Sequence, residues 1–282
     1  MNVKTPVAPL NFQADGLSIT AAEPWFKVKV QLVQRYLQAF IMNAAAKADE
    51  IIFVDAFSGS GLYSTGHQKA IFPSVALATL AGDLPIHRWI FCERDPEQAY
   101  ALQVRVKKYG PEKNVSVFSD ALPELTDRFR TSLPTSKRGH KVAVLCLVDP
   151  FSLDMPLGLM EKWSALGFSF VVPFTFVLND RLTYQHYTED HPDTLRKYIG
   201  GTGFDSLSKV TSNIQFYKHL VRLYQNNMLV MGMNTALSVH KLESHLINLP
   251  VFYMGFFSRQ FSAQAIQRDV NVSEHLQFDL FG

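Results

Sequence analysis

The chain has 282 residues, of which 47% are hydrophobic and 18% are charged, so it is too apolar to be disordered and can bury a sizeable core. Its 27 basic and 25 acidic side chains give a formal net charge of +2, which provides no strong overall field for gathering polyanions. Any nucleic-acid surface therefore has to be local. We expect one domain over residues 1–282, because α/β sheets often reach this length with additions.

The sequence predicts a cytoplasmic protein without a membrane anchor. Its two cysteines, Cys92 and Cys146, lie in apolar segments that are typical of buried strands, so neither a disulfide framework nor a cysteine-based metal site is expected. This cysteine usage suits a reducing compartment. The N-terminus lacks a basic segment followed by an apolar one, and no apolar stretch reaches the roughly 18 residues that a transmembrane helix needs.

The first elements are predicted from the period of their apolar residues. An N-terminal arm and helix occupy residues 1–48: the arm, 1–22, lacks periodicity, whereas apolar residues recur at intervals of three and four from Pro24 to Ala46. Short apolar runs and helical patterns then alternate. The predicted strands are 51–54, 88–92, 115–118, 142–148 and 168–178, and the predicted helices are 73–82, 97–109, 122–129 and 157–166. This alternation indicates parallel βαβ units.

The C-terminal part is predicted to close the sheet. Segment 179–208 is polar and contains three glycines, and it is either an insertion that shapes a substrate site or a structural connector. A helix is predicted over 213–227, an antiparallel edge hairpin over 235–242 and 251–258, and a closing helix over 260–269. The predicted fold class is α/β: a mostly parallel Rossmann-like sheet with an antiparallel edge hairpin and helices on both faces.

Four acidic residues end or follow four successive predicted strands. They are Asp55, Glu93, Asp120 and Asp149. The carboxyl ends of parallel strands converge at one edge of a sheet, where α/β proteins bind ligands, so we expect these carboxylates to lie near one another. Taken singly, each is more often a solvated helix cap or a turn residue. Their coincidence at one edge favours a ligand site.

The loop after the first of these strands reads Ala-Phe-Ser-Gly-Ser-Gly. Its candidate cofactor-binding residues, together with Asp55, are Phe57, Ser58, Gly59 and Gly61. The glycines permit close backbone approach to a ligand, because a side chain there would fill the space that the ligand needs. A dinucleotide site would prefer G-x-G-x-x-G leading directly into a helix, so a nucleotide-dependent oxidoreductase is disfavoured.

The next two strand ends offer contacts to an adenosine. A carboxylate at Glu93 can accept hydrogen bonds from both ribose hydroxyls, and Asp120, with its neighbour Ala121, can contact the adenine amino group. The stretch between the glycine loop and Glu93 is longer than a loop, helix and strand require. Its excess is either a lid that brings His67 and Lys69 near the ligand or a surface excursion.

These residues make the sequence resemble the class I methyltransferases, which bind S-adenosylmethionine. V-D-A-F-S-G-S-G at 54–61 is similar to their first motif, Glu93 to their ribose acid and Asp120 to their adenine-region acid, over roughly residues 51–178. More narrowly, the chain resembles the three-Cys-motif partner (TcmP) family of bacteria and phages. That resemblance is carried by the first motif and by K-V-Q-L-V-Q-R-Y-L at 29–37, F-C-E-R-D at 91–95, L-V-D-P-F at 147–151 and F-Y-M-G-F-F at 252–257. It implies a methyltransferase-like fold and a partner protein that carries a metal–sulfur motif.

Asp149, Pro150 and Phe151 are the candidate catalytic residues. The carboxylate and the proline carbonyl can accept hydrogen bonds from an amino group, while the aromatic ring can stack on a substrate ring. They resemble the D-P-P-Y/F motif of enzymes that methylate exocyclic amino groups in nucleic acids, but with one proline and the aromatic residue one position earlier. The alternative is a simple strand end, since proline cannot continue a ladder and Asp favours turns.

The leading hypothesis is an S-adenosylmethionine-dependent methyltransferase that acts on an amino group, preferably of a nucleic-acid base. The alternative is a catalytically silent adaptor of the same fold that serves a partner protein, which the single proline keeps open. Methyl transfer from a sulfonium needs alignment, exclusion of water and a destination for the proton, but no metal. Lys29, on the first predicted helix, can reach a cofactor carboxylate, although a solvated helix face is the commoner role.

Overall fold

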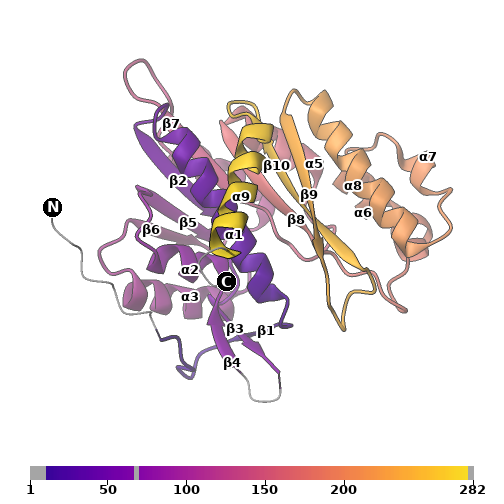
Figure 1. Cartoon of the computed structure of the whole chain (residues 1–282), viewed down its shortest axis with the longest axis horizontal. Helices are drawn as coiled ribbons and strands as arrows, with labels where there is room; N and C mark the ends of the chain where they lie inside the picture. The colour runs from indigo at the N-terminus through magenta and orange to yellow at the C-terminus, as the bar shows by residue number, and fades with distance from the viewer. Residues whose placement is uncertain (1–10, 67–69, 279–282) are drawn as a thin grey trace.

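The computed structural model describes residues 11–66 and 70–278, and within them one sheet has seven strands. Their spatial order is β6 (Val115–Phe118), β5 (Arg88–Cys92), β2 (Glu50–Asp55), β7 (Val142–Leu147), β8 (Phe168–Phe174), β10 (Val251–Ser258) and β9 (Asn234–Lys241). The first five strands are parallel, whereas β10 is antiparallel to both of its neighbours. This confirms the predicted mostly parallel, Rossmann-like sheet with its antiparallel edge hairpin (Figure 1).

Two layers of helices cover the faces of this sheet. One layer contains α1 (Phe26–Ala44), α2 (Val75–Ala81), α3 (Pro96–Tyr109) and α9 (Ala263–Phe278). The other contains α4 (Leu122–Ser132), α5 (Leu157–Ala165), α6 (Pro192–Ile199) and α8 (Asn213–Val230). Within each layer neighbouring helices contact one another, and Figure 1 shows α1 and α9 side by side in front of the sheet.

The central strands are apolar because both of their faces are covered. Every residue of β7 and β8 is buried, and β2 is buried from Ile51 to Asp55. Continuous apolar runs are what a parallel strand between two helix layers requires. Cys92 and Cys146 are buried in this sheet as free thiols, as the sequence predicts, and their burial raises the pKa of both.

Differences from the predicted elements concern their ends and segment 179–208. The strand predicted over 168–178 ends at Phe174, although most of 175–178 remains buried, because an apolar run reports burial and not strand pairing. The closing helix extends to Phe278. Segment 179–208 contains the π-helical turn η1 (His186–Asp190), α6 and α7 (Phe204–Leu207), and α6 packs between α5 and α8.

A second, smaller sheet follows the glycine loop and was not predicted from the sequence. β3 (Leu62–Thr65) and β4 (Ala70–Pro73) are antiparallel, and β1 (Thr20–Ala21) of the N-terminal arm pairs in parallel with β3. These strands are too short to show a period, and the pairing of β1 with β3 joins segments that are far apart in the chain. His67 and Lys69, the residues of the lid hypothesis, lie outside the described residues, as do residues 1–10 of the arm.

A buried arginine fastens the arm to the glycine loop. Arg105 of α3 is fully buried, and its guanidinium group donates to the two carboxylate oxygens of Asp15 at 2.8 and 2.6 Å. It also donates to the main-chain carbonyl oxygens of Ser18 in the arm, at 2.8 Å, and of Ser60 in the loop, at 2.6 Å. The hydrogen bond from Arg105 lowers the pKa of the Asp15 carboxyl. One side chain therefore joins α3, the arm and the loop.

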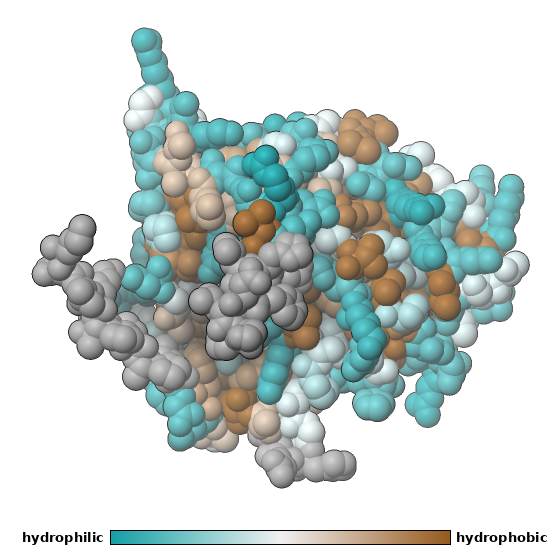
Figure 2. All heavy atoms as spheres, in the orientation of Figure 1, coloured by the Kyte–Doolittle hydropathy of each residue, from teal (hydrophilic) through white to brown (hydrophobic). Residues whose placement is uncertain are grey.

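The surface carries no single dominant apolar region on the face that displays α1 and α9. Figure 2 shows hydrophobic side chains there in separate groups among hydrophilic ones, which is normal for a globular protein. Across the described ranges, none of the helices combines the length and hydropathy that crossing a bilayer requires.

Candidate functional site

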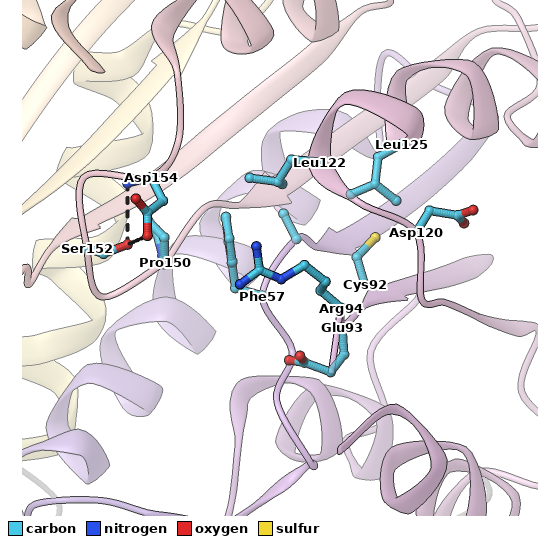
Figure 3. A pocket seen from close by; sticks show the side chains of 11 residues that line it. Phe57, Cys92, Glu93, Arg94, Asp120, Leu122, Leu125, Pro150, Ser152 and Asp154 are labelled. Carbon is cyan, nitrogen blue, oxygen red and sulfur yellow. Dashed lines mark hydrogen bonds between the residues drawn. The ribbon is translucent and has the colours of Figure 1, made fainter. Parts of the chain in front are cut away.

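A pocket of about 150 Å³ lies where the carboxyl ends of β2, β5, β6 and β7 meet. Its lining residues are Ala56, Phe57, Cys92, Glu93, Arg94, Asp120, Leu122, Leu125, Pro150, Ser152 and Asp154 (Figure 3). Four of the residues singled out from the sequence, Phe57, Glu93, Asp120 and Pro150, thus come together in one pocket. Each of them comes from a different strand end.

Glu93 ties the glycine loop to the second strand end. Its two carboxylate oxygens accept hydrogen bonds from the N–H of Gly59 at 2.9 Å and from the N–H of Asp95 at 2.8 Å. Asp95 in turn caps α3 by accepting from the N–H groups of Glu97 and Gln98. A carboxylate oxygen has two lone pairs, so each oxygen of Glu93 can accept one further hydrogen bond from a ligand in the pocket.

The two loop glycines serve different purposes. Gly59 has a φ of +59° and Gly61 a φ of +89°, both in the left-handed region that favours glycine. A Cβ on Gly59 would meet only ordinary contacts, the nearest being Thr20 Oγ1 at 3.5 Å. A Cβ on Gly61 would come within 3.0 Å of Leu77 and Leu102, so close packing on α2 and α3 requires this glycine. The sequence analysis explains Gly61 by space for a ligand, whereas in the structure the glycine leaves space for core side chains.

Asp55 and Ser58 lie beneath the loop and are not among the residues that line the pocket. The Asp55 carboxylate accepts the N–H of Phe57 at 3.1 Å, and the Ser58 hydroxyl donates to the main-chain oxygen of Asp55 at 3.0 Å. Burial raises the pKa of Asp55 to about 7, although the hydrogen bond from Phe57 opposes this shift. The charge of Asp149 raises the pKa further and that of Lys29 lowers it. In this structure both side chains shape the loop.

The third strand end places Asp120 at the pocket, but its carboxylate has a partner on α4. Arg128 Nε donates to its two oxygens at 3.2 and 3.1 Å, and Figure 3 shows the carboxylate pointing away from Phe57 and Pro150. Ala121 is the N-cap residue of α4 and is not part of the pocket lining. Arg94 also lines the pocket and is not predicted from the sequence, although it directly follows Glu93.

The Asp149 carboxylate is engaged on both of its oxygens. Oδ2 forms an ion pair with Lys29 Nζ at 2.5 Å, and Oδ1 accepts a hydrogen bond from Thr175 Oγ1 at 3.0 Å. The exposed fractions of the Lys29 and Asp149 side chains are only 3% and 9%. The interpretation of Lys29 as part of a solvated helix face is therefore wrong. Lys29 belongs to the buried face of α1, next to the candidate reacting residues.

Phe151 packs on protein side chains and does not line the pocket. Its ring lies 5.5 Å from the ring of Phe26 and 6.4 Å from that of Trp25, measured between centroids. Among the described residues other than glycine, it alone has a positive φ, +56°, a conformation that costs such a residue about 1–3 kcal/mol. Next to it, the Ser152 hydroxyl donates to Asp154 at 2.9 Å (Figure 3). Stacking of Phe151 on a substrate ring would require this turn to rearrange.

No family model matches the chain, and no curated protein is similar to it in sequence. Similar solved structures include a DUF519-family protein from Legionella pneumophila, which is 10% identical over 81% of this chain and 84% of that chain, with a TM-score of 0.48. The O-methyltransferase from Bacillus cereus, solved with SAH, is 11% identical over 80% of each chain, with a TM-score of 0.44. The magnesium protoporphyrin IX methyltransferase from Synechocystis, solved with bound SAM, is 7% identical over 83% of this chain and 82% of that chain, with a TM-score of 0.41.

These comparisons concern the fold alone, because the identities and TM-scores are low. The fold assignment itself rests on the strand order and the strand directions of the main sheet.

Proposed function

We propose that this protein is an S-adenosylmethionine-dependent methyltransferase. The observation that carries the proposal is Glu93, a residue of the pocket lining whose carboxylate holds Gly59 of the loop and keeps one unused lone pair on each oxygen. A ribose diol is a ligand group that such a carboxylate can accept from in a bidentate manner. The apolar side chains of Leu122, Leu125 and Pro150 suit a flat purine beside it.

The volume of the pocket limits how much of the cofactor it can hold. Small-molecule sites usually measure at least about 300 Å³, whereas this pocket has about 150 Å³. The pocket is therefore smaller than a site for the whole cofactor usually is.

Within this proposal the cofactor supplies the electrophilic methyl group, and the chain provides position and charge. Glu93 and the loop would orient the nucleoside, while the apolar walls would exclude water from the reacting end. The Pro150 carbonyl and an unused lone pair of Asp149 would orient an acceptor amino group. A proton released from the acceptor nitrogen would pass to the carboxylate of Asp149, which directly precedes Pro150.

The finer assignments also belong to this proposal. An exocyclic amino group of a nucleic-acid base is the preferred acceptor, on the similarity of Asp149-Pro150-Phe151 to the motif of enzymes with that activity. Membership in the TcmP family, with a three-Cys-motif protein as partner, is proposed on the motifs at 29–37, 91–95 and 147–151. A cytoplasmic location is proposed on the cysteine usage.

A silent adaptor of the same fold is the second candidate, and two observations favour it. The Asp149 carboxylate is occupied by Lys29 and Thr175, and the Phe151 ring stacks on the side of α1. Such a protein would bind the cofactor without transferring its methyl group.

Replacing Glu93 by alanine is expected to weaken binding of both S-adenosylmethionine and S-adenosylhomocysteine roughly 100-fold, because two charge-assisted hydrogen bonds to the ribose are lost. The loop N–H of Gly59 also loses its acceptor. Isothermal titration calorimetry measures the affinities, with the exposed Glu97→Ala variant as the matched control. Absence of binding by the folded wild-type protein, or undiminished binding by Glu93→Ala, would refute the proposed cofactor site.

Replacing Asp149 by asparagine separates the enzyme from the adaptor. With methyl-labelled cofactor and pooled DNA, RNA and protein, the enzyme is expected to transfer label, and the variant to transfer at least about 100-fold less, as for a lost general base. Asp127→Asn, at an exposed position on α4, is the control and is expected to retain full transfer. Label transfer that survives Asp149→Asn contradicts the assigned role. A wild-type protein that binds cofactor but labels no pool supports the adaptor.

A further inference from the structure

Lys29 is a buried cation with an enclosed environment. Besides the ion pair with Asp149, its ammonium group lies 4.3 Å from the ring centroid of Phe26, 5.5 Å from that of Trp25 and 5.7 Å from that of Phe151. Aromatic faces attract a cation, and the attraction is larger in a desolvated site. Three rings and one carboxylate therefore hold the positive charge of Lys29 at a defined place.

This place adjoins the point where methyl transfer is proposed to occur. Asp149 immediately precedes Pro150, which lines the pocket, and β7 pairs with β2, the strand that ends in Asp55. The charges of Asp149 and Lys29 both act on Asp55, so groups at these two strand ends are coupled electrostatically. A third charge that binds between these strand ends will therefore interact with the charges of both Asp149 and Lys29.

The positively charged sulfonium of S-adenosylmethionine would be such a charge when the cofactor donates its methyl group to an acceptor held by Asp149 and Pro150. The methyl carbon and the acceptor atom have to approach to about 3–3.5 Å, and Asp149, which would hydrogen-bond to the acceptor, pairs with Lys29 Nζ at 2.5 Å. The sulfonium would therefore lie within roughly 10 Å of the Lys29 ammonium group. At an effective dielectric constant of about 20, unit charges at that separation change an affinity by roughly tenfold or more. An unpaired Asp149 would favour the cation by a similar factor, and an unpaired Lys29 would oppose it.

We infer that Lys29 is a specificity-determining residue whose charge cancels that of Asp149 beside the sulfonium and so sets the affinity for S-adenosylmethionine relative to S-adenosylhomocysteine. The inference rests on the proposed function. The two ligands share every group except the methyl group, whose loss turns the cationic sulfonium into a neutral thioether. The ratio of their affinities therefore reports the local charge and is insensitive to contacts that both ligands make. With the pair intact, the product leaves no more slowly than the donor on electrostatic grounds.

Four proteins test the inference as a charge series. They are the wild type, Lys29→Met, Asp149→Asn and the double variant. We expect Lys29→Met to shift the affinity ratio roughly tenfold toward S-adenosylmethionine and Asp149→Asn to shift it roughly tenfold toward S-adenosylhomocysteine. The double variant, which is neutral, is expected to return to the wild-type ratio.

Two controls accompany the series. Lys27→Met removes the same charge from the exposed side of the same helix and is expected to leave the ratio unchanged, while Lys29→Arg keeps the charge and is expected to retain the wild-type ratio. Circular dichroism identifies any variant that fails to fold. If a single variant fails to fold, the double variant can still be measured, because it contains no unpaired buried charge.

The outcomes separate the inference from the proposed function. If neither ligand binds the wild type, the proposed function fails. If both ligands bind the wild type and Lys29→Met weakens both equally, Lys29 contacts a group that they share, such as the carboxylate, and the inference is overturned. An unchanged ratio in Lys29→Met and in Asp149→Asn overturns it as well.

Discussion

Replacing Asp55 by asparagine is expected to stabilise the folded protein at pH 8 by roughly 4 kcal/mol. Burial raises the pKa of this carboxyl from 3.8 to about 7, because the charged form loses its hydration. Between these two values the folded state binds a proton that the unfolded state has released. The free energy of unfolding of the wild type therefore decreases as the pH rises through this window, and the full penalty is present above about pH 7.

Asparagine removes this penalty and keeps the local contact. It is neutral at every pH in the window, and its Oδ1 can accept the N–H of Phe57 as Asp55 does. Urea unfolding from about pH 4 to about pH 8 measures the effect, and the stability difference between variant and wild type is expected to grow up to about pH 7 and then level off. The exposed Asp127→Asn variant serves as control. A difference that is independent of pH, or an Asp55→Asn protein less stable than the wild type at alkaline pH, would contradict the expectation.

Asp55, at the end of β2, lowers the stability of the folded protein, which is typical of a residue that is kept for function. Proteins tolerate locally unfavourable residues where a ligand needs them, and stabilising substitutions there often reduce function. We therefore expect that the stability gained by Asp55→Asn is accompanied by weaker cofactor binding, since this carboxylate shapes the turn that leads to Gly59.

The sequence predicted the main sheet and the shared edge of its four strand ends because both depend on simple patterns. A strand between two helix layers is apolar throughout, and carboxyl ends of parallel strands converge whatever the loops contain. The burial of Lys29 also follows from a sequence pattern. It follows Phe26 by three residues and precedes Val33 by four, which places it on the apolar face of its helix. A lysine in that stripe needs a buried partner.

Other features could not be predicted because they depend on contacts between distant segments. The left-handed conformation of Phe151 is accompanied by packing on Trp25 and Phe26, which lie more than a hundred residues earlier in the chain. The third strand of the small sheet forms only because the arm, at Thr20, reaches β3. Neither a period nor a turn signal in the local sequence reports such a pairing.

Replacing Arg105 by methionine is expected to lower the free energy of unfolding by roughly 3–5 kcal/mol, as when one partner of a buried ion pair is removed. Methionine fills part of the volume but donates no hydrogen bond, so the carbonyl oxygens of Ser18 and Ser60 lose their donor. Asp15→Asn removes the charge and one of the two acceptor oxygens of the partner but leaves the hydrogen bonds to Ser18 and Ser60, so it is expected to cost less. Arg130→Met, which breaks an exposed ion pair on α4, is expected to cost at most about 1 kcal/mol.

Urea unfolding also reports how the arm is coupled to the rest of the chain. If the arm and the loop unfold together with the main sheet, Arg105→Met lowers the transition midpoint and leaves the denaturant slope unchanged; if the arm detaches first, the slope falls, because less surface is exposed in the main transition. We expect the unchanged slope, since Arg105 lies on α3 and contacts both the arm and Ser60. Binding of S-adenosylhomocysteine to the loop would then stabilise the arm as well, because a ligand that binds only the folded state stabilises everything that unfolds with its site. Loss of less than about 1 kcal/mol in Arg105→Met would show that the arm is energetically separate from the loop.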